Sequence, residues 1–405
     1  MIRFISQNNH SMMPVEVARG EKQMNRSYTI VIFVFVVMVT AGNLSARAED
    51  INIHGFISQG YLKTNQNNYL AETDDGSFQF NEMGINFTTY VSDRLSLGCQ
   101  FYARDLGDVG NDEIVINWAF AEFEYKNWLR LRVGTLKIPI GLYNDLRDFD
   151  CLRTSIFLPS SLYNEWIRDA ANSIKGMEFF GTVGMGKAGL MEYQFQTGAM
   201  RISPDSGTSL FLEKTHGIIV SDIRTGNANN MRLVWTTPID GLRFCVAGLH
   251  PDQLKIIGTN GLTIVNKDIY TATFSVEYAL RNLKLTAENW WTKGKTVPYV
   301  FGKPIENQII NNDHNDSFYV SLGYRFTNWF EASFYYSNYI EFKNVHEDSN
   351  ELKDHCLSFR FDINPFWIAK LEAHVMEGEF GVFPDNDGHT YNEWMLYAAK
   401  VSYSF

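Results

Sequence analysis

The sequence is poor in the residues and motifs that mark disulfide scaffolds, metal sites and enzymes. Four cysteines in 405 residues are too few for a disulfide framework, and no Cys-x-x-Cys or Cys/His metal spacing occurs. There is no Gly-x-Ser-x-Gly, and the histidines are scattered, so an enzyme such as a lipase or protease is the weakest alternative. We therefore predict no catalytic residues, no cofactor and no metal site.

Long hydrophobic runs are also missing after residue 50. No window there is apolar enough for a spanning helix, so a membrane location would require a barrel. Aromatic residues, in contrast, are abundant at 15%, and 30 glycines with only 10 prolines suit many strands and turns. The formal net charge of −11 argues against a general nucleic-acid binder.

One apolar segment stands near the N-terminus, from Tyr28 to Leu44. Arg26 precedes it, and Ala46-Arg47-Ala48 resembles a cleavage site, so we predict an upstream leader plus signal peptide over residues 1–48. Met24 is an alternative start, and a single membrane anchor is the alternative interpretation of the segment. Cleavage after Ala48 leaves residues 49–405, with 30 basic and 44 acidic side chains.

The remaining chain alternates with a period of two. In 95–104, Leu95, Leu97, Cys99 and Phe101 share one face, whereas Gln100 and Arg104 lie on the other. Similar segments are separated by seven short turns: Ser92-Asp93-Arg94, Lys126-Asn127, Gly186-Lys187, Pro238 to Gly241, Arg281-Asn282, Thr327-Asn328-Trp329 and Asn364-Pro365. Eight longer connections lie at 62–77, 105–113, 138–175, 198–229, 251–268, 293–315, 342–354 and 378–392.

This order of connections requires sixteen antiparallel strands with both ends on the short-turn side. It predicts an all-β transmembrane antiparallel barrel, with a soluble β-sandwich as the alternative. A sixteen-stranded barrel is too wide for its side chains to fill, so its interior holds water or an inserted segment. Aromatic residues flank the short turns and are predicted to form a girdle at lipid headgroup level: Tyr125, Trp128, Phe326, Trp329, Phe330, Phe366 and Trp367.

Three stretches resemble Gram-negative outer-membrane porins. The last strand, WMLYAAKVSYSF, ends on Phe405 and resembles the signal that such barrels present to their assembly machinery. The first strand, INIHGFISQGYL, is similar to porin opening strands, and LRLRVGTLKIPIGLYNDLRD resembles the entry to the third loop of phosphate-selective O/P-type porins. A general porin is better supported than that subfamily. The resemblance implies a homotrimer and a third loop, 138–175, that folds into the barrel and narrows it.

Charged residues of this loop and of the inward wall are the candidate site. The pore-lining and constriction residues that we predict are Arg104, Arg130, Arg132, Lys137, Arg147, Asp148, Asp150, Arg153, Glu165, Arg168 and Asp169. The alternative is that several loop charges pair with each other and anchor the loop. On the wall we count ten inward basic residues, Arg130 and Arg132 foremost, against six acidic ones. This excess predicts a mild anion preference in a channel for ions and small hydrophilic solutes.

Other properties follow less directly from the sequence. The acidic long loops suit bridging through divalent cations to lipopolysaccharide at the cell surface, although such charge runs are more often a solvated face. A closed-lumen receptor or adhesin is the main alternative function, because loops 198–229 and 293–315 are long and rich in Asn and Gly. The sequence assigns no disulfide among Cys99, Cys151, Cys245 and Cys356.

Overall fold

The computed structural model describes residues 51–305, 310–313, 317–340 and 351–405. The predicted leader, the cleavage site after Ala48 and most of the predicted loop 342–354 lie outside these residues. In the described part of the chain, no helix is long and apolar enough to cross a membrane.

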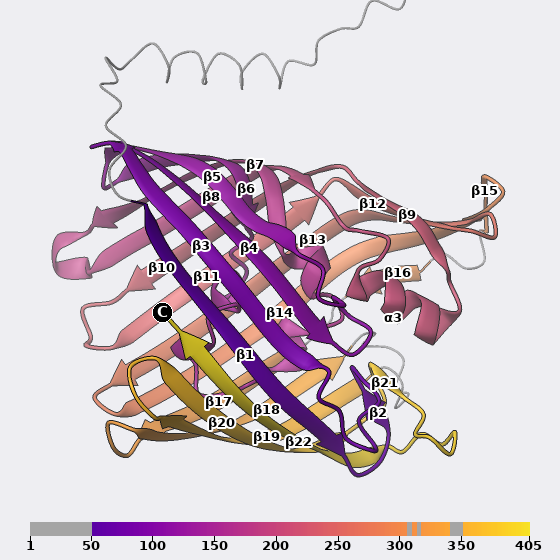
Figure 1. Cartoon of the computed structure of the whole chain (residues 1–405). Coiled ribbons are helices and arrows are strands. Elements are labelled where there is room, and N and C mark those ends of the chain that lie inside the picture. Colours follow the sequence, from indigo (N-terminus) through magenta and orange to yellow (C-terminus); the bar gives the residue numbers. More distant parts are fainter. Residues whose placement is uncertain (1–50, 306–309, 314–316, 341–350) are drawn as a thin grey trace, which may run out of the picture. The chain divides into compact units, whose positions relative to one another are not determined.

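Sixteen long antiparallel strands close into a barrel in the described ranges (Figure 1). In chain order they are β1 (Asn52–Thr64), β3 (Phe80–Ser92), β4 (Leu95–Leu106), β5 (Val115–Lys126), β6 (Leu129–Lys137), β7 (Ser173–Gly184), β8 (Leu190–Met200), β10 (Asn227–Thr236), β11 (Leu242–Pro251), β13 (Leu262–Leu280), β14 (Leu283–Val300), β17 (Ser317–Arg325), β18 (Phe330–Ile340), β19 (Glu351–Asp362), β20 (Trp367–Glu377) and β22 (Glu393–Ser404). Strand β1 pairs with β3 and also with β22, which closes the sheet. The prediction of a sixteen-stranded barrel is confirmed.

Short and long connections alternate as predicted. Seven short ones, at 93–94, 127–128, 185–189, 237–241, 281–282, 326–329 and 363–366, join strands at one rim. The start of β1 and the C-terminal residue lie at the same rim, where the N–H of Gly55 donates to the carbonyl of Phe405 at 3.1 Å. The long connections carry the remaining elements: β2 (Asn68–Tyr69), η1 (Asn144–Leu146), η2 (Asp150–Leu152), α2 (Ser160–Tyr163), η3 (Arg168–Ala171), α3 (Gly207–His216), β9 (Val220–Thr225), β12 (Gln253–Gly258), β15 (Lys303–Pro304), β16 (Ile310–Asp313) and β21 (Val382–Phe383). One short turn also contains a 3-10 helix, η4 (Gly186–Ala188).

Two predicted loop boundaries are wrong. The loops 251–268 and 293–315 begin or end inside β13 and β14, which are 19 and 18 residues long and pair with each other from Leu262 to Val300. Their outer parts are rich in β-branched residues that support strand pairing, including Thr263, Ile264 and Val265. The strands therefore continue beyond the predicted turn signals.

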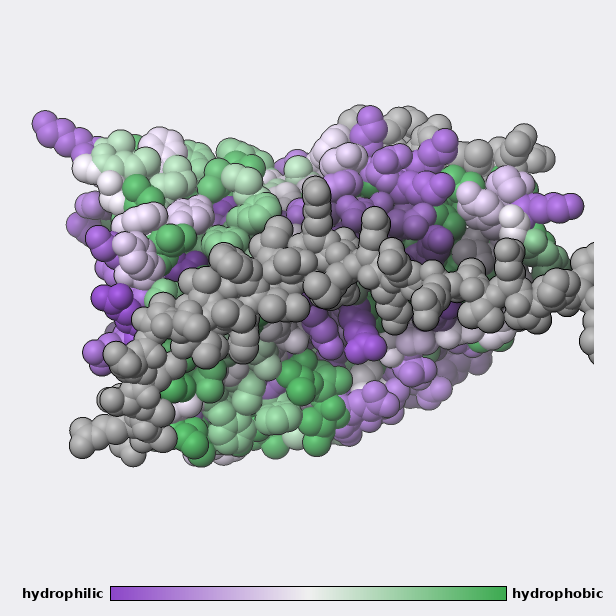
Figure 2. All heavy atoms as spheres, turned by 90° about the horizontal axis from the view of Figure 1, so that it is seen from above, coloured by the Kyte–Doolittle hydropathy of each residue, from purple (hydrophilic) through white to green (hydrophobic). Residues whose placement is uncertain are grey.

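The two faces of the wall differ as the alternation predicts. Leu97 is 43% exposed on the outside, whereas Gln100 is 0% exposed on the lumen side. The girdle residues Tyr125, Trp128, Phe326 and Trp329 are likewise exposed beside the short turns. Figure 2 shows hydrophobic residues gathered in the half nearer the short turns, between hydrophilic residues at the outermost short-turn edge and those of the long-loop half. Such an outer surface is apolar where a water-soluble protein would be polar.

The largest apolar core lies inside the barrel, toward the long loops. Phe157 and Trp166 of the connection between β6 and β7 pack there with wall residues such as Phe80, Leu396 and Trp394. The rings of Phe80 and Phe157 stack with centroids 5.3 Å apart. A segment of the third long connection thus fills part of the space that the closed wall encloses.

Candidate functional site

The connection between β6 and β7 folds into the barrel. Its backbone amides donate to inward side chains of three different strands: Leu142 N–H to Glu288 Oε2 (2.9 Å), Ile156 N–H to Glu372 Oε1 (2.6 Å) and Ser161 N–H to Ser337 Oγ (3.2 Å). These anchors hold the loop across the lumen, and the predicted inward fold of the third loop is confirmed. We call residues 138–172 the constriction loop.

The apolar residues of the constriction loop are buried because they pack against the wall and against each other. Ile138, Ile140, Ile156 and Trp166 are almost inaccessible to solvent. Trp166 also donates its indole N–H to the carbonyl of Gly381 at 3.1 Å. The apolar content that set this loop apart in the sequence therefore serves to dock it.

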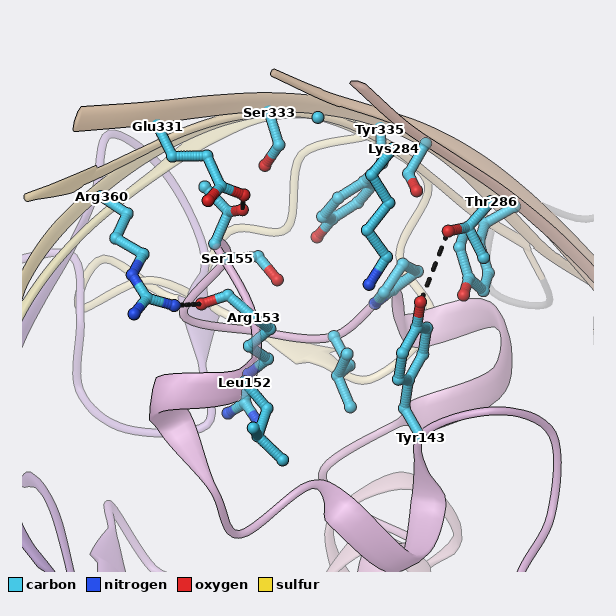
Figure 3. A pocket seen from close by; sticks show the side chains of 16 residues that line it. Tyr143, Leu152, Arg153, Ser155, Lys284, Thr286, Glu331, Ser333, Tyr335 and Arg360 are labelled. Atoms are coloured by element: carbon cyan, nitrogen blue, oxygen red, sulfur yellow. Dashed lines mark hydrogen bonds between the residues drawn. The ribbon is translucent and has the colours of Figure 1, made fainter. Parts of the chain in front are cut away.

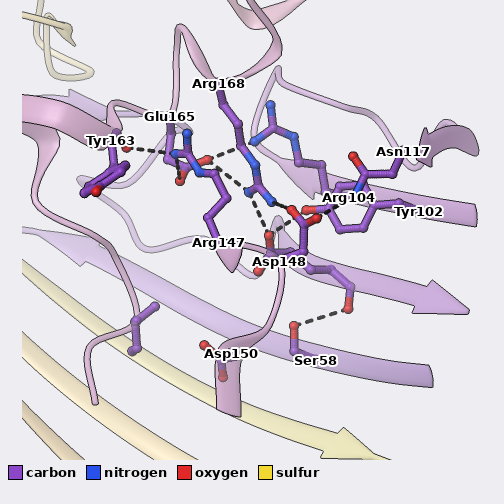
Figure 4. Close-up of polar contacts among 12 residues, drawn as sticks. Ser58, Tyr102, Arg104, Asn117, Arg147, Asp148, Asp150, Tyr163, Glu165 and Arg168 are labelled. Atoms are coloured by element: carbon purple, nitrogen blue, oxygen red, sulfur yellow. Dashed lines mark hydrogen bonds and ion pairs between the residues drawn. The ribbon is translucent and has the colours of Figure 1, made fainter. Parts of the chain in front are cut away.

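Arg168 is the centre of a buried ion-pair cluster that joins the constriction loop to the wall (Figure 4). Its guanidinium contacts Asp148 at 2.6 Å, Glu82 of β3 at 2.9 Å and Glu165 at 3.3 Å. Arg104 of β4 reaches the same Glu165 at 2.9 Å. Three carboxylates thus share one guanidinium, and a second guanidinium ties the cluster to another strand.

Further pairs continue the cluster on both sides. Arg147 contacts Glu165 at 2.7 Å, and Lys137 contacts Asp148 at 2.9 Å. Arg104 also contacts Asp169 at 3.0 Å. On the other side of the loop, Asp150 lies 2.9 Å from the ammonium of Lys370 and accepts from Ser402 at 2.7 Å, while Arg153 lies 3.7 Å from Asp150.

The charged state of the loop carboxylates depends on these partners. Burial by itself would raise the pKa of Glu165, but the surrounding guanidiniums, those of Arg147 and Arg168 foremost, lower it to about 2. The pKa of Asp148 is likewise held well below its usual range by Lys137 and Arg168, against the effect of burial. Both carboxylates are ionised at neutral pH and hold the loop through charge-assisted hydrogen bonds.

The structure therefore divides the eleven predicted site residues into two groups. Nine of them form the cluster just described, and of these only Asp169 keeps about a third of its side chain exposed. The contacts of these nine residues are those expected if the loop charges pair with one another and with the wall and so anchor the loop. Arg130 and Arg132 lie elsewhere, on the wall of β6, where their side chains remain partly exposed.

Toward the short turns the ion pairs of the wall include side chains that are partly exposed to solvent. Arg132 contacts Glu122 at 2.7 Å and Glu178 at 3.2 Å, and Arg130 lies 3.7 Å from Glu122. Arg132 is 27% exposed but Glu178 only 2%. Further round the wall, Lys284, 40% exposed, lies 3.3 Å from the carboxylate of Glu277, 7% exposed.

The basic partner is the more exposed one in most of these wall pairs. Arg243 follows the same rule with Glu277, and Arg325 with Asp362, whereas Arg360 is slightly more buried than Asp362. A mobile ion in the lumen would therefore meet more cationic than anionic surface on this part of the wall.

The predicted excess of ten basic over six acidic wall residues is too large. Glu122 and Glu178 contact Arg132 on the lumen side, and Asp354 contacts His374 there, so the acidic count was too low. Strand β5 carries aromatic residues on both faces, including Phe120 under Arg132 and Phe123, so its alternation did not reveal which glutamates point inward.

No protein-family model and no curated protein sequence matches the chain. Solved structures do match its fold. The anion-selective porin from Comamonas acidovorans superposes with a TM-score of 0.56 at 13% identity over 88% of this chain and 99% of its own. OmpF of Salmonella typhi superposes with a TM-score of 0.58 at 12% identity, over 89% of this chain and 100% of its own. The outer membrane channel DcaP of Acinetobacter baumannii superposes with a TM-score of 0.51 at 11% identity, over 88% of this chain and 97% of its own.

The barrel has the general porin fold.

Space remains in this porin-fold barrel beside the constriction loop. A cavity of about 260 Å³ lies between the loop and strands β14 and β17 to β19, with Tyr143 and Arg153 on the loop side and Lys284, Glu331 and Arg360 on the wall (Figure 3). Tyr143 also donates its hydroxyl to Glu277, which fixes the ring beside Lys284. Cations of both the wall and the loop thus line this polar cavity, and Lys284 is the most exposed of them.

A second cavity of about 560 Å³ lies on the long-loop side of the ion-pair cluster. Its lining includes Arg104, Asn117, Asp169, Lys175 and Arg201. Polar side chains of both charge signs thus face the space above and below the constriction loop. All four cysteines are free thiols in this structure.

Proposed function

We propose that this chain is an outer-membrane porin of a Gram-negative bacterium, forming a water-filled channel for passive diffusion of ions and small hydrophilic solutes. The observation that carries the proposal is the constriction loop held across the lumen of a closed barrel whose outward face is apolar and whose inward face is polar. No enzymatic activity is expected.

A mild anion preference is the proposed selectivity. Its support is the greater exposure of the basic partner in the wall pairs, for example Lys284 against Glu277 and Arg132 against Glu178. Carboxylates that are buried behind cations contribute less to the potential at the channel axis than the cations do. The neighbour from Comamonas acidovorans is described as anion-selective, which agrees with this proposal.

The experiment is single-channel recording in planar bilayers, with protein purified in detergent. Stepwise open-channel conductance and a reversal potential of anionic sign in a salt gradient are expected. Steady conductance with a reversal potential of cationic sign would contradict the proposed anion preference but would still support the proposed porin function. Spin labels at Leu97 and Gln100 should report lipid and the buried lumen side beneath the constriction loop, respectively. Identical surroundings would contradict the membrane barrel.

A closed-lumen surface receptor or adhesin is the second candidate. The extent to which the constriction loop fills the lumen, with nine predicted pore residues in its anchoring cluster, favours this candidate. Such a barrel would give no steady conductance steps, so the same recording separates the two functions.

Export and assembly complete the proposal. A signal peptide within residues 1–48 would direct the chain to the periplasm, and the terminal strand ending at Phe405 would be recognised by the barrel-assembly machinery. In the membrane we expect contact with lipid and lipopolysaccharide, and a homotrimer. Deletion of Phe405 should lower the amount of folded protein in the outer membrane without changing the amount synthesised.

A further inference from the structure

A compact group of side chains of the types that bind metals lies in the wall beneath the constriction loop. The group is separate from the wall cations, such as Lys284 and Arg132, on which the proposed ion selectivity rests. Cys356 of β19 and His374 of β20 are directly paired across the two strands, and Glu372 is paired with Ser358 two residues further along. All three side chains are buried. Phe157 of the loop covers them, with its ring centroid 6.3 Å from that of His374.

Two of the separations among the three candidate ligand atoms, both measured from Nε2 of His374, match those around a single small metal ion, and all three atoms lie within 4.8 Å of one another. The Sγ of Cys356 lies 3.7 Å from Nε2 of His374, and that nitrogen lies 3.3 Å from Oε2 of Glu372. In a tetrahedral zinc site, bond lengths of about 2.3 Å to sulfur and about 2.1 Å to nitrogen and oxygen put these atoms about 3.6 and about 3.4 Å apart. The observed separations agree with both values.

The surroundings orient the histidine as a metal ligand. Nδ1 of His374 lies 3.0 Å from Oδ1 of Asp354, which leaves Nε2 directed at the cysteine and the glutamate. Tyr335 in turn donates its hydroxyl to Asp354 at 2.8 Å. A carboxylate that holds the other ring nitrogen of a ligating histidine is the usual outer shell of zinc sites.

We propose that Cys356, Glu372 and His374 form a binding site for Zn²⁺, with water as the fourth ligand. Thiolate, imidazole and carboxylate together suit zinc, whereas calcium and magnesium prefer oxygen ligands alone. Binding releases the thiol proton of Cys356 to solvent, since only the thiolate coordinates.

The site would also strengthen the attachment of the constriction loop. Oε1 of Glu372 accepts from Ile156 N–H at 2.6 Å and from the hydroxyl of Ser358 at 2.7 Å. Oε2, the oxygen 3.3 Å from His374 Nε2, accepts from Phe157 N–H at 3.1 Å and would keep a second lone pair for the metal. A metal on Oε2 leaves the Oε1 contact to the loop in place. The bound ion would then join β19 and β20 at the point where the loop docks.

The competing interpretation is a hydrogen-bond network without metal, in which a protonated His374 lies between Asp354 and Glu372. The two differ in one respect: only the metal site requires the sulfur of Cys356. Cobalt(II), which replaces zinc in such sites, makes that requirement visible, because a thiolate ligand adds a near-ultraviolet charge-transfer band to the visible bands of a tetrahedral ion.

The test is a cobalt titration of the folded mature protein in detergent after treatment with a chelator, followed by competition with zinc. One ion per chain and a charge-transfer band that zinc abolishes are expected. Cys356→Ser should lose the band, and the matched variants Cys245→Ser and Cys151→Ser should keep it. Asp354→Asn, which keeps all three ligands, should weaken zinc binding about tenfold to 100-fold.

A second variant protects the test against misfolding of Cys356→Ser. A triple variant, Cys99→Ser, Cys151→Ser and Cys245→Ser, retains Cys356 alone and should give the full band. No band in this variant and in the parent, or an equal band in Cys356→Ser, would overturn the proposal. Channel conductance in metal-free buffer is measured in parallel, so failure here does not bear on the proposed porin function.

Discussion

The ion pairs beneath the constriction loop and those of the wall near the short turns use the same residue types in different surroundings. Arg168 and its carboxylates are sealed between loop and wall, whereas Lys284 and Arg132 keep 40% and 27% of their side chains exposed. We call these the sealed cluster and the open wall. The comparison shows that the covering of a charged residue, rather than its inward direction, decides whether it anchors the loop or faces the open lumen.

The two regions should respond differently to the loss of one charge. A buried ion pair gains little over an apolar contact, but removal of one partner leaves an uncompensated charge in a medium that solvates it poorly. On the open wall, water and salt replace much of the lost partner. Stability should therefore depend on the sealed cluster, and ion selectivity on the open wall.

The largest effect is expected for Arg168→Gln. This change leaves Asp148, Glu82 and Glu165 without their shared guanidinium. We expect a loss of about 3 to 5 kcal/mol in the free energy of unfolding, measured by denaturant titration in detergent. Conductance should also rise or become noisy as the loop loosens. The exposed Arg201→Gln is the control, and a loss below about 1 kcal/mol for Arg168→Gln would contradict the anchoring role.

A pH series on Glu165→Gln sharpens the same point. The folded pKa of Glu165, about 2, lies below its ordinary value of 4.5, so its contribution to stability is complete above about pH 4.5 and is lost as the pH falls toward 2. The parent should be more stable than Glu165→Gln by on the order of 2 kcal/mol at pH 7, and this difference should shrink toward pH 3. Unfolding midpoints at each pH measure it; a constant difference would show that the glutamate acts through packing instead.

On the open wall, charge reversal should change selectivity rather than stability. Lys284→Glu places a carboxylate beside the cavity at the constriction loop and should lower the anion-to-cation permeability ratio about twofold or more. Arg132→Glu should act in the same direction. Lys187→Glu, at an exposed short turn, is the matched control with the same change of charge. The reversal potentials of the three variants are measured in a salt gradient and compared with that of the parent. If Lys187→Glu shifted the reversal potential as much as the two wall variants, the selectivity would not depend on the lumen wall.

Alternation and connection length were enough to predict the barrel from the sequence, because a closed sheet between lipid and water imposes both along the whole chain. They also placed Arg130 and Arg132 on the wall, since Leu129 and Leu131 define the outward face of β6. The partners of Arg168 could not be predicted, because Glu82 and Asp148 are brought to it by the path of a loop that has no repeat.

The group around His374 was missed for a related reason. Cys356 precedes Glu372 and His374 by 16 and 18 residues and meets them only through the register of β19 and β20, which no local spacing motif reveals. The signal was present in the sequence as Cys356 and His374, both on the inward face of strands joined by a short turn. Pairing residues outward from that turn would have placed the two opposite each other.

The smallest effect on the free energy of unfolding is expected for an ion pair that is short but exposed. Arg232 and Asp145 form a two-pronged pair, with both N–O distances 2.8 Å, between β10 and the constriction loop. Arg224 contacts Asp222 at 2.7 Å within β9, but its side chain is 69% exposed. Arg224→Ala should change the free energy of unfolding by less than about 0.5 kcal/mol, because water and salt screen an exposed pair, whereas Arg232→Ala should cost several times more. Equal losses in denaturant titrations would mean that short ion-pair contacts stabilise this barrel regardless of their burial, and the distinction between sealed cluster and open wall would fail.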